Sequence, residues 1–433
     1  MPQKPASPPA TLEFTISHLG GLGDGIAEHE GRPVFIPFTC PGDRVQVRIT
    51  QEHKDFLRAE VTALLTPSPK RQTPPCHHFG TCGGCSLQHL NPKTYRQFKQ
   101  DRLLQAIDGL SNTDTVICPL METTAGTRRR VELRVGVQKG TVSLGFLPAG
   151  QIHGVVDITM CPLLGERLFD ETQCLRTALQ QLRKPSHLHT VQLTQVENGL
   201  DILFTLSKPL PEDDLQQLFT YAAARESVLR LSVRPIDACP TRLFQRSDVT
   251  LPLGNVTIQL PEGAFLQATT DGQQALTDFI LRHSADSRVI ADIYSGCGTY
   301  SFPLVKHGAA VHAYEGDAAM ILAMQQAIHT HQLEPCLTAT QRDLYRHPLP
   351  AQQLNAYDTI VINPPRNGAL PQIKEIARSH AHRVVMLSCN PATFRRDAKC
   401  LYANGFQLKE AQAIDQFLWS PHLELAALFE RNA

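Results

Sequence analysis

Strand-like and helix-like segments alternate from about residue 262 onward, and this alternation constrains the fold more than any other feature of the chain. A repeated order of strand and helix predicts a parallel sheet covered by helices. The apolar run Val289-Ile-Ala-Asp-Ile-Tyr294 indicates a buried strand, and the glycine-rich turn Ser295-Gly-Cys-Gly-Thr299 follows it. We therefore predict an α/β domain over residues 262–433.

The glycine-rich turn has the features of a cofactor-binding loop. Its glycines let the backbone approach a ligand closely, and Thr299 closes the turn. Glu315 ends the next predicted strand, where an acid accepts hydrogen bonds from ribose hydroxyls. Ser301 replaces the third glycine of a dinucleotide loop, which disfavours NAD and favours S-adenosylmethionine, a cofactor without a pyrophosphate. Asp343, at the expected end of the third strand, is placed to meet the adenine.

Cys389 is the candidate for the reacting residue. It follows the strand-like run Arg383-Val-Val-Met-Leu387, at the carboxyl edge where open α/β sheets bind ligands. The fourth strand ends at Asn363, and two prolines after it fix the backbone so that the Asn side chain faces the site. Glu424 is a carboxylate in an apolar strand. A thiol, a cofactor loop and a candidate base indicate an enzyme with a covalent intermediate; the alternative is a buried core thiol.

The amino-terminal part of the chain has a different pattern. Residues 10–66 read as short alternating strands separated by Gly and Pro turns, which predicts a small β-barrel. Residues 67–261 form a predicted central α+β domain, and residues 1–10 read as a disordered tail.

A cysteine cluster opens the central domain. Three thiols lie close together in sequence and can converge on one metal centre: Cys76, Cys82 and Cys85. Cys161 is the best fourth ligand, because it precedes a proline and a Cys-Pro pair is common at iron–sulfur ligands. This favours a [4Fe-4S] cluster; zinc held with His77 or His78 is the competing interpretation.

Composition restricts the compartment and the partners. No apolar run reaches the roughly 18 residues that a membrane helix needs, and no secretory h-region is found near the start, so we expect a cytoplasmic protein. In that compartment, 12 cysteines indicate thiols and metal ligands rather than disulfides. The 41 basic and 41 acidic residues cancel, which counts against nucleic-acid binding, although clusters such as Arg128-Arg-Arg130 weaken that objection.

Several motifs now stand in order: the loop at 292–299, Asn363-Pro-Pro-Arg, Ser388-Cys-Asn-Pro391 and His422-Leu-Glu424. Together they resemble the RNA uracil-5-methyltransferase family. The start of the chain, with Gly20-Gly-Leu-Gly-Asp-Gly25, resembles a TRAM domain, an OB-like RNA-binding barrel. With the cysteine cluster, it resembles the iron–sulfur branch that modifies 23S ribosomal RNA; the tRNA-modifying branch typically lacks that cluster.

The resemblance implies a Rossmann-like class I methyltransferase domain and assigns roles to single residues. Cys389 matches the nucleophile and Glu424 the proton acceptor. Further residues match S-adenosylmethionine contacts: Gln267, Tyr294 and Glu315. The cluster ligands of the branch match Cys76, Cys82, Cys85 and Cys161. One position departs from the family, which usually has Asp where this chain has Asn363.

The chemistry of uracil agrees with these roles. A thiolate that adds to carbon 6 makes carbon 5 able to attack a methyl donor, and a separate base must then remove the carbon 5 proton. We expect an unstacked uridine in an RNA loop as substrate, and no protein partner is implied. The alternatives are tRNA uridine methylation, RNA cytosine-5 methylation, amino-group methylation, which Arg366 after the two prolines disfavours, and non-catalytic RNA binding.

Overall fold

The computed structural model describes residues 11–431 and divides the chain into two compact units. Unit 1 contains the described residues up to Arg102 together with Pro148–Ile152 and Trp419–Pro421, and unit 2 contains the others. The predicted tail and residue 10 of the predicted barrel lie outside the described residues. The domain bounds 10–66, 67–261 and 262–433 stay a prediction. No helix within residues 11–431 has the length and apolar character needed to span a bilayer.

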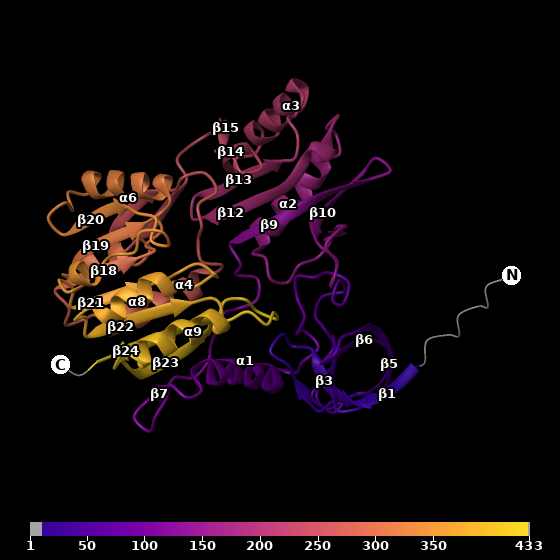
Figure 1. Ribbon diagram of the computed structural model, residues 1–433. Helices are drawn as coiled ribbons and strands as arrows, with labels where there is room; N and C mark the ends of the chain where they lie inside the picture. The colour runs from indigo at the N-terminus through magenta and orange to yellow at the C-terminus, as the bar shows by residue number, and fades with distance from the viewer. Residues whose placement is uncertain (1–10, 432–433) are drawn as a thin grey trace. The chain divides into compact units, whose positions relative to one another are not determined.

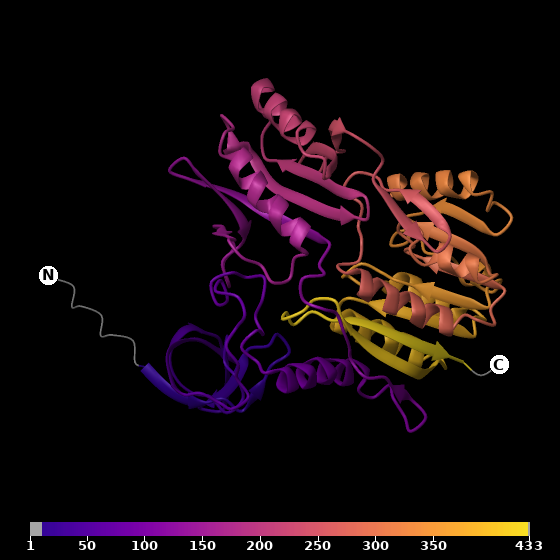
Figure 2. The same ribbon diagram turned by 180° about the vertical axis from the view of Figure 1, so that it is seen from behind.

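Unit 1 is built on a six-stranded sheet in the order β1-β5-β6-β4-β3-β2. Register shifts along the β5–β6 hairpin mark bulges, which increase the twist of a sheet, and Figure 2 shows the strands curling around a common centre. The centre is a small apolar core that includes Val34, Ile36, Val45 and Val47. The predicted small β-domain is confirmed. Its strands are β1 (Thr11–Thr15), β2 (His18–Leu19), β3 (Gly25–His29), β4 (Arg32–Ile36), β5 (Arg44–Glu52) and β6 (Leu57–Thr66).

The division between the units falls within helix α1 (Pro92–Ile107), after Arg102. One part of unit 2 is a seven-stranded sheet in the order β11-β10-β9-β12-β13-β14-β15. Helices α2 (Glu166–Leu179) and α3 (Glu212–Ala223) cover its apolar face, and the short helix η1 (Pro185–His187) precedes β12. The strands are β9 (Arg130–Gln138), β10 (Thr141–Phe146), β11 (Val156–Asp157), β12 (Leu188–Val196), β13 (Gly199–Leu206), β14 (Val228–Pro235) and β15 (Thr241–Gln245).

A nine-stranded sheet forms the rest of unit 2, in the order β20-β19-β18-β21-β22-β24-β23-β7, with β8 also paired to β23. The strands from β20 to β22 are parallel, and β24 enters antiparallel between β22 and β23. The strands are β7 (Val116–Ile117), β8 (Met121–Glu122), β18 (Val289–Ile293), β19 (Ala310–Glu315), β20 (Leu337–Gln341), β21 (Thr359–Ile362), β22 (Arg383–Ser388), β23 (Gln407–Asp415) and β24 (Glu424–Glu430).

Helices cover both faces of this sheet (Figure 1). They are α4 (Thr270–Arg282), α5 (Ser301–Lys306), α6 (Ala318–Thr330), α7 (Ala351–Leu354), α8 (Leu370–Arg378) and α9 (Pro391–Tyr402). The hairpin of β16 (Thr250–Leu253) and β17 (Val256–Gln259) joins the core that α4, α5 and α6 complete.

The sequence forms this arrangement because its strands are apolar on both sides. In β22, Val385 and Leu387 enter one core, and Val384 and Met386 enter the other. Residues in a strand alternate between faces, so a continuous apolar run needs cover on both. The α/β prediction is confirmed. Because β18 lies between β19 and β21, the strand order reverses there, and ligands of such sheets bind beside that point at the carboxyl ends.

Candidate functional site

The predicted site residues gather at one edge of the nine-stranded sheet. Five parallel strands end there, and each ends at or just before a predicted residue: Tyr294 for β18, Glu315 for β19, Asp343 for β20, Asn363 for β21 and Cys389 for β22. Strand β24 is antiparallel to β22, with Leu425 opposite Ser388. The antiparallel direction therefore brings Glu424, the first residue of β24, to the edge at which Cys389 lies.

Cys389 and Glu424 influence each other electrostatically. Burial raises the pKa of the half-buried Cys389 thiol, the charge of Glu424 raises it further, and the guanidinium of Arg366 opposes both, partly through a hydrogen bond. Burial also raises the pKa of Glu424 to about 7, against the effects of Gln416 and Arg366. The site thus combines a thiol with a carboxylate that exchanges a proton near neutral pH, a pairing suited to nucleophilic and base chemistry.

Two buried glutamines connect Glu424 to the predicted cofactor residues. The amide Nε2 of Gln416 donates to Oε2 of Glu424 at 3.0 Å and to Oε1 of Gln267 at 2.7 Å. Gln267 in turn donates to the Tyr300 hydroxyl at 3.2 Å. Gln267 was predicted from the sequence, Gln416 was not, and Arg366 was noted only as the residue after the two prolines. No local pattern marks Gln416, because its importance depends on the pairing of β23 with β24.

The loop after β18 contains three residues with positive φ values, a backbone conformation that glycine adopts easily and other residues rarely. Gly296 and Gly298 have φ values of 57° and 86°, and Tyr294 has a φ of 64°, which is uncommon for a residue with a side chain. A Cβ on Gly298 would lie 2.7 Å from the Phe302 ring, whereas a Cβ on Gly296 would meet nothing within 4 Å. The space above Gly296 is therefore open to a ligand. Thr299, also predicted here, hydrogen-bonds to the thiol of the buried Cys297.

Polar groups of the loop remain available to a cofactor. Within residues 11–431, the buried Oγ of Ser295 and Oδ1 of Asp292 have no hydrogen-bond partner, while Oδ2 of Asp292 accepts from Ser301 at 2.5 Å. Oε2 of Glu315 accepts from the Gly296 N–H at 3.0 Å, and Oε1 accepts from the Gly316 and Asp317 N–H groups at 2.7 and 3.0 Å. A carboxylate offers about four acceptor sites, which leaves room for a ribose hydroxyl. An open space beside unsatisfied polar atoms fits a nucleoside-type ligand.

Tyr294 links the other predicted cofactor residues. Burial raises the pKa of its phenol to about 12, and the charges of Glu315 and Asp343 act in the same direction, so the three side chains share one region. Asp343 is exposed, and its Oδ1 accepts from the backbone N–H groups of Tyr345 and Arg346 at 3.1 and 3.0 Å. Asn363 is half-buried, and its backbone N–H donates to Ile293 at 3.1 Å.

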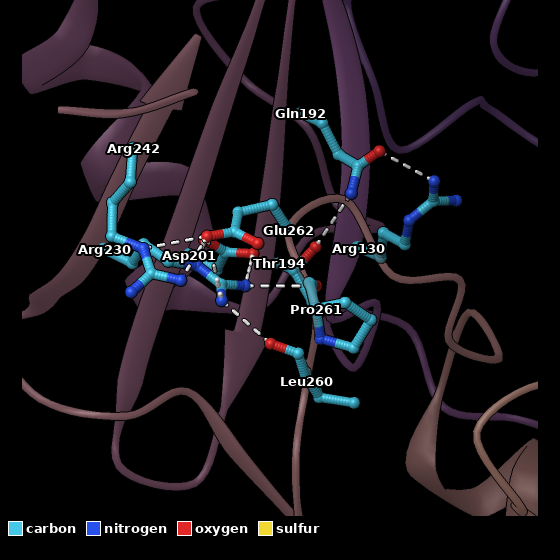
Figure 3. A network of polar contacts seen from close by, with 9 residues as sticks. All are labelled: Arg130, Gln192, Thr194, Asp201, Arg230, Arg242, Leu260, Pro261 and Glu262. Carbon is cyan, nitrogen blue, oxygen red and sulfur yellow. Dashed lines mark hydrogen bonds and ion pairs between the residues drawn. The ribbon is translucent and has the colours of Figure 1, made fainter. Parts of the chain in front are cut away.

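A buried ion pair anchors the segment that leads to Gln267 (Figure 3). Arg230 binds Asp201 through two contacts of 2.8 Å and also donates to the carbonyl oxygens of Leu260 at 2.8 Å and Pro261 at 3.1 Å. Because Arg230 and Asp201 are both almost fully buried, the contacts are rigidly held. The segment after β17 is therefore tied to the seven-stranded sheet a few residues before Gln267.

The predicted metal ligands do not form a metal site in the described geometry. Cys76, Cys82 and Cys85 are half-buried in unit 1, and Cys161 is half-buried in unit 2. Among residues 11–431, no three His, Cys, Asp or Glu side chains are grouped closely enough to hold a metal ion. The donor chemistry suits a thiolate-ligated centre, and the Gly84 N–H donates to the Cys82 sulfur at 3.4 Å. The ligand types therefore fit a cluster, and the ligand set stays a prediction.

An open cleft of about 780 Å³ lies elsewhere in unit 2. Its lining includes Arg129, Gln195, Gln273 and Lys306, and none of the predicted site residues.

Known proteins resemble this chain over its whole length. Residues 10–62 match the TRAM domain, and residues 248–432 match the family described as tRNA (uracil-5-)-methyltransferase. An uncharacterized RNA methyltransferase of Brucella melitensis is 34% identical, over 98% of this chain and 98% of that protein. The 23S rRNA (uracil(1939)-C(5))-methyltransferase RlmD of Shewanella frigidimarina is 31% identical, over 100% of this chain and 98% of that protein.

The fold agrees with a solved structure. The tRNA (uracil-54, C5)-methyltransferase of Pyrococcus abyssi, crystallised with S-adenosyl-L-homocysteine, superposes with a TM-score of 0.75 over 96% of this chain and 99% of that one, at 22% identity.

Proposed function

Because the chain belongs to the RNA (uracil-5-)-methyltransferase family, we propose that it methylates carbon 5 of a uridine in 23S ribosomal RNA, with S-adenosylmethionine as the methyl donor. The observation that carries the proposed mechanism is the register of β22 and β24, which brings Cys389 and Glu424 to one edge of the sheet.

Cys389 acts as the nucleophile. Its thiolate adds to carbon 6 of the uracil, and the electron pair of the carbon 5–carbon 6 double bond becomes available at carbon 5. Bound S-adenosylmethionine supplies an electrophilic methyl group. Arg366 favours the thiolate, because it opposes the effects of burial and of Glu424 on the pKa of Cys389. Its positive charge also suits the enolate that develops on the uracil.

Glu424 completes the reaction as the base. It removes the proton from carbon 5, the electrons of that bond restore the double bond, and the bond between carbon 6 and Sγ breaks to return the thiolate. A carboxylate with a pKa near 7 is well matched to this step at neutral pH.

The cofactor residues are proposed from the loop at the end of β18. Tyr294, Thr299 and the open space over Gly296 receive S-adenosylmethionine, Glu315 accepts its ribose hydroxyls, and Asp343 meets the adenine. Gln267 and Asn363 contact the cofactor from the side of the substrate.

The RNA class is proposed from the relative that acts on 23S ribosomal RNA. The family model that matches residues 248–432 is named for tRNA, so transfer RNA is the second candidate. Nucleoside analysis of both RNA pools from a deletion strain separates them. Loss of 5-methyluridine from 23S ribosomal RNA supports the proposal, and loss from transfer RNA alone contradicts it.

Trapping tests the mechanism directly. RNA that carries 5-fluorouridine should form a stable covalent adduct with the protein, because fluorine at carbon 5 cannot be removed as a proton. Cys389→Ala should form no adduct and transfer no methyl group, yet bind S-adenosylmethionine within a few-fold of the natural protein. Cys336→Ala, at an exposed cysteine outside the site, is the matched control. Turnover by purified Cys389→Ala would exclude Cys389 as the nucleophile.

We also propose a [4Fe-4S] cluster with Cys76, Cys82, Cys85 and Cys161 as ligands. The support is the donor chemistry and the N–H donor to the Cys82 sulfur. Protein purified without oxygen should contain about four iron atoms per chain. Cys82→Ser should lose them, and Cys336→Ser should keep them. One zinc and no iron would favour the zinc interpretation instead.

A further inference from the structure

Gln416 lies at the centre of the buried contacts around Glu424. Only 2% of its surface is exposed, and all its amide hydrogen-bonding groups are used. Its Oε1 accepts from the backbone N–H of Ala268 at 3.1 Å, and its Nε2 donates to Gln267 and to Glu424.

These contacts allow only one orientation of the amide. A backbone N–H can only donate, so the atom of Gln416 that faces Ala268 must be the oxygen. The two hydrogens of Nε2 then face two acceptor oxygens, at 2.7 and 3.0 Å. A flipped amide would place its NH2 group against the N–H of Ala268 and its oxygen against the two acceptor oxygens. Each of these buried mismatches is costly.

The fixed orientation determines which carboxylate oxygen of Glu424 reacts. Oε2 receives the N–H of Gln416, and no described residue hydrogen-bonds to Oε1. An N–H donor stabilises the ionised carboxylate rather than the neutral acid. The same amide fixes Gln267, because Oε1 of Gln267 accepts from Gln416 and its Nε2 faces Tyr300.

We infer that Gln416 is a positioning residue of the methylation reaction: it favours the ionised form of Glu424, directs Oε1 at the carbon 5 proton, and joins this base to Gln267 at the cofactor. The inference rests on the proposed function. Three charged or titratable groups that interact with Glu424 are Arg366, Cys389 and Tyr300. They come from other parts of unit 2 and stay in place when Gln416 is changed.

The test separates formation of the covalent adduct from its decay. Gln416→Met keeps the length of the side chain and removes the donor, so only Arg366 still opposes the effect of burial on the pKa of Glu424. In single-turnover reactions with uridine RNA, release of methylated RNA at pH 7 should slow at least about ten-fold, and the pH profile of release should shift by about one unit to higher pH. Adduct formation by Cys389 should change little. A role confined to folding would not move the pH profile.

Two further variants keep the result interpretable. Gln416→Ala makes room for water, which can donate to Glu424 in place of the amide, so its shift should have the same direction but be smaller; it also serves if Gln416→Met does not fold. Gln412→Met is the matched control and should behave like the natural protein, because Gln412 lies in β23, which ends just before Gln416, and makes only a 3.5 Å contact to a backbone carbonyl. If the natural protein forms an adduct and neither Gln416 variant shifts the profile of release, this inference is wrong. If the natural protein forms no adduct, the proposed function itself fails.

Discussion

The reaction proposed here depends on two side chains whose proton affinities are set by their surroundings. Burial raises the pKa of both Cys389 and Glu424, and Arg366 opposes the shift in both. The proposed reaction works best when the Cys389 thiolate and the Glu424 carboxylate are present at the same time. Repulsion between the two negative charges disfavours that state. Arg366 and Gln416 lower that cost, so two residues with no role predicted from the sequence in this reaction determine whether Cys389 and Glu424 can act.

Asn363 provides a prediction at this scale. A neutral Asn offers both a donor and an acceptor, as the edge of uracil requires. Asn363→Ala should slow single-turnover methylation by the equivalent of roughly 1–3 kcal/mol, the cost of leaving a buried polar partner unsatisfied. Asn363→Asp should be neutral or harmful, because an ionised carboxylate accepts hydrogen bonds but cannot donate one to uracil. A clear gain in rate for Asn363→Asp would show instead that a negative charge is needed here.

The loop between β18 and α5 is the element on which cofactor binding is proposed to depend. Its glycines serve different purposes. Gly298 has a φ of 86° and packs against Phe302, whereas Gly296 has a φ of 57° and faces open space. A side chain at Gly298 would disturb the packing of the fold, whereas a side chain at Gly296 would fill the space proposed for the cofactor.

This difference predicts that alanine at Gly298 mainly lowers stability, whereas alanine at Gly296 mainly weakens cofactor binding. Gly298→Ala should lower the free energy of unfolding by about 1–2 kcal/mol from backbone strain and by more from the contact with Phe302. Gly296→Ala should cause the strain alone but weaken S-adenosylmethionine binding at least about ten-fold, because the new methyl group fills the open space. Urea unfolding and calorimetric titration check the pair. Normal cofactor affinity in folded Gly296→Ala would place the cofactor elsewhere.

At the scale of the molecule, unit 2 buries two carboxyl groups whose pKa values are raised to about 7, Asp292 and Glu424. Their ordinary values are 3.8 and 4.5. Burial is the main cause of both shifts. The folded protein therefore binds a proton at each of these carboxyl groups more tightly than the unfolded chain does. The contribution of each group to the free energy of unfolding is fully present below its ordinary pKa. This contribution is lost as pH rises through the raised pKa of about 7.

We therefore predict that removing either charge stabilises the protein at the higher pH. Glu424→Gln and Asp292→Asn should each raise the free energy of unfolding relative to the natural protein, by an amount that grows between pH 5 and pH 8 toward about 3 kcal/mol. Urea unfolding at several pH values measures the difference. A difference independent of pH would show that the carboxyls titrate normally.

Much of the fold was predictable because its causes are local. A continuous apolar run, such as that of β22, by itself indicates a strand in a parallel sheet with helices on both faces. Turns at Gly296 and Gly298 follow from residue type, and Cys389, Asn363 and Glu315 could be placed at strand ends because the carboxyl ends of parallel strands share one edge.

The tertiary structure alone decided which side chains meet. The insertion of β24 between β22 and β23 puts Glu424 at the edge where Cys389 lies, and a long-range register of this kind leaves no trace in local spacing. The same pairing lets Gln416 reach both Glu424 and Gln267. The sequence by itself therefore determined the elements and the reactive groups, since these depend on residue type and short periodicity. Strand order and burial determined the protonation and partners of those groups, since both depend on segments far apart in the chain.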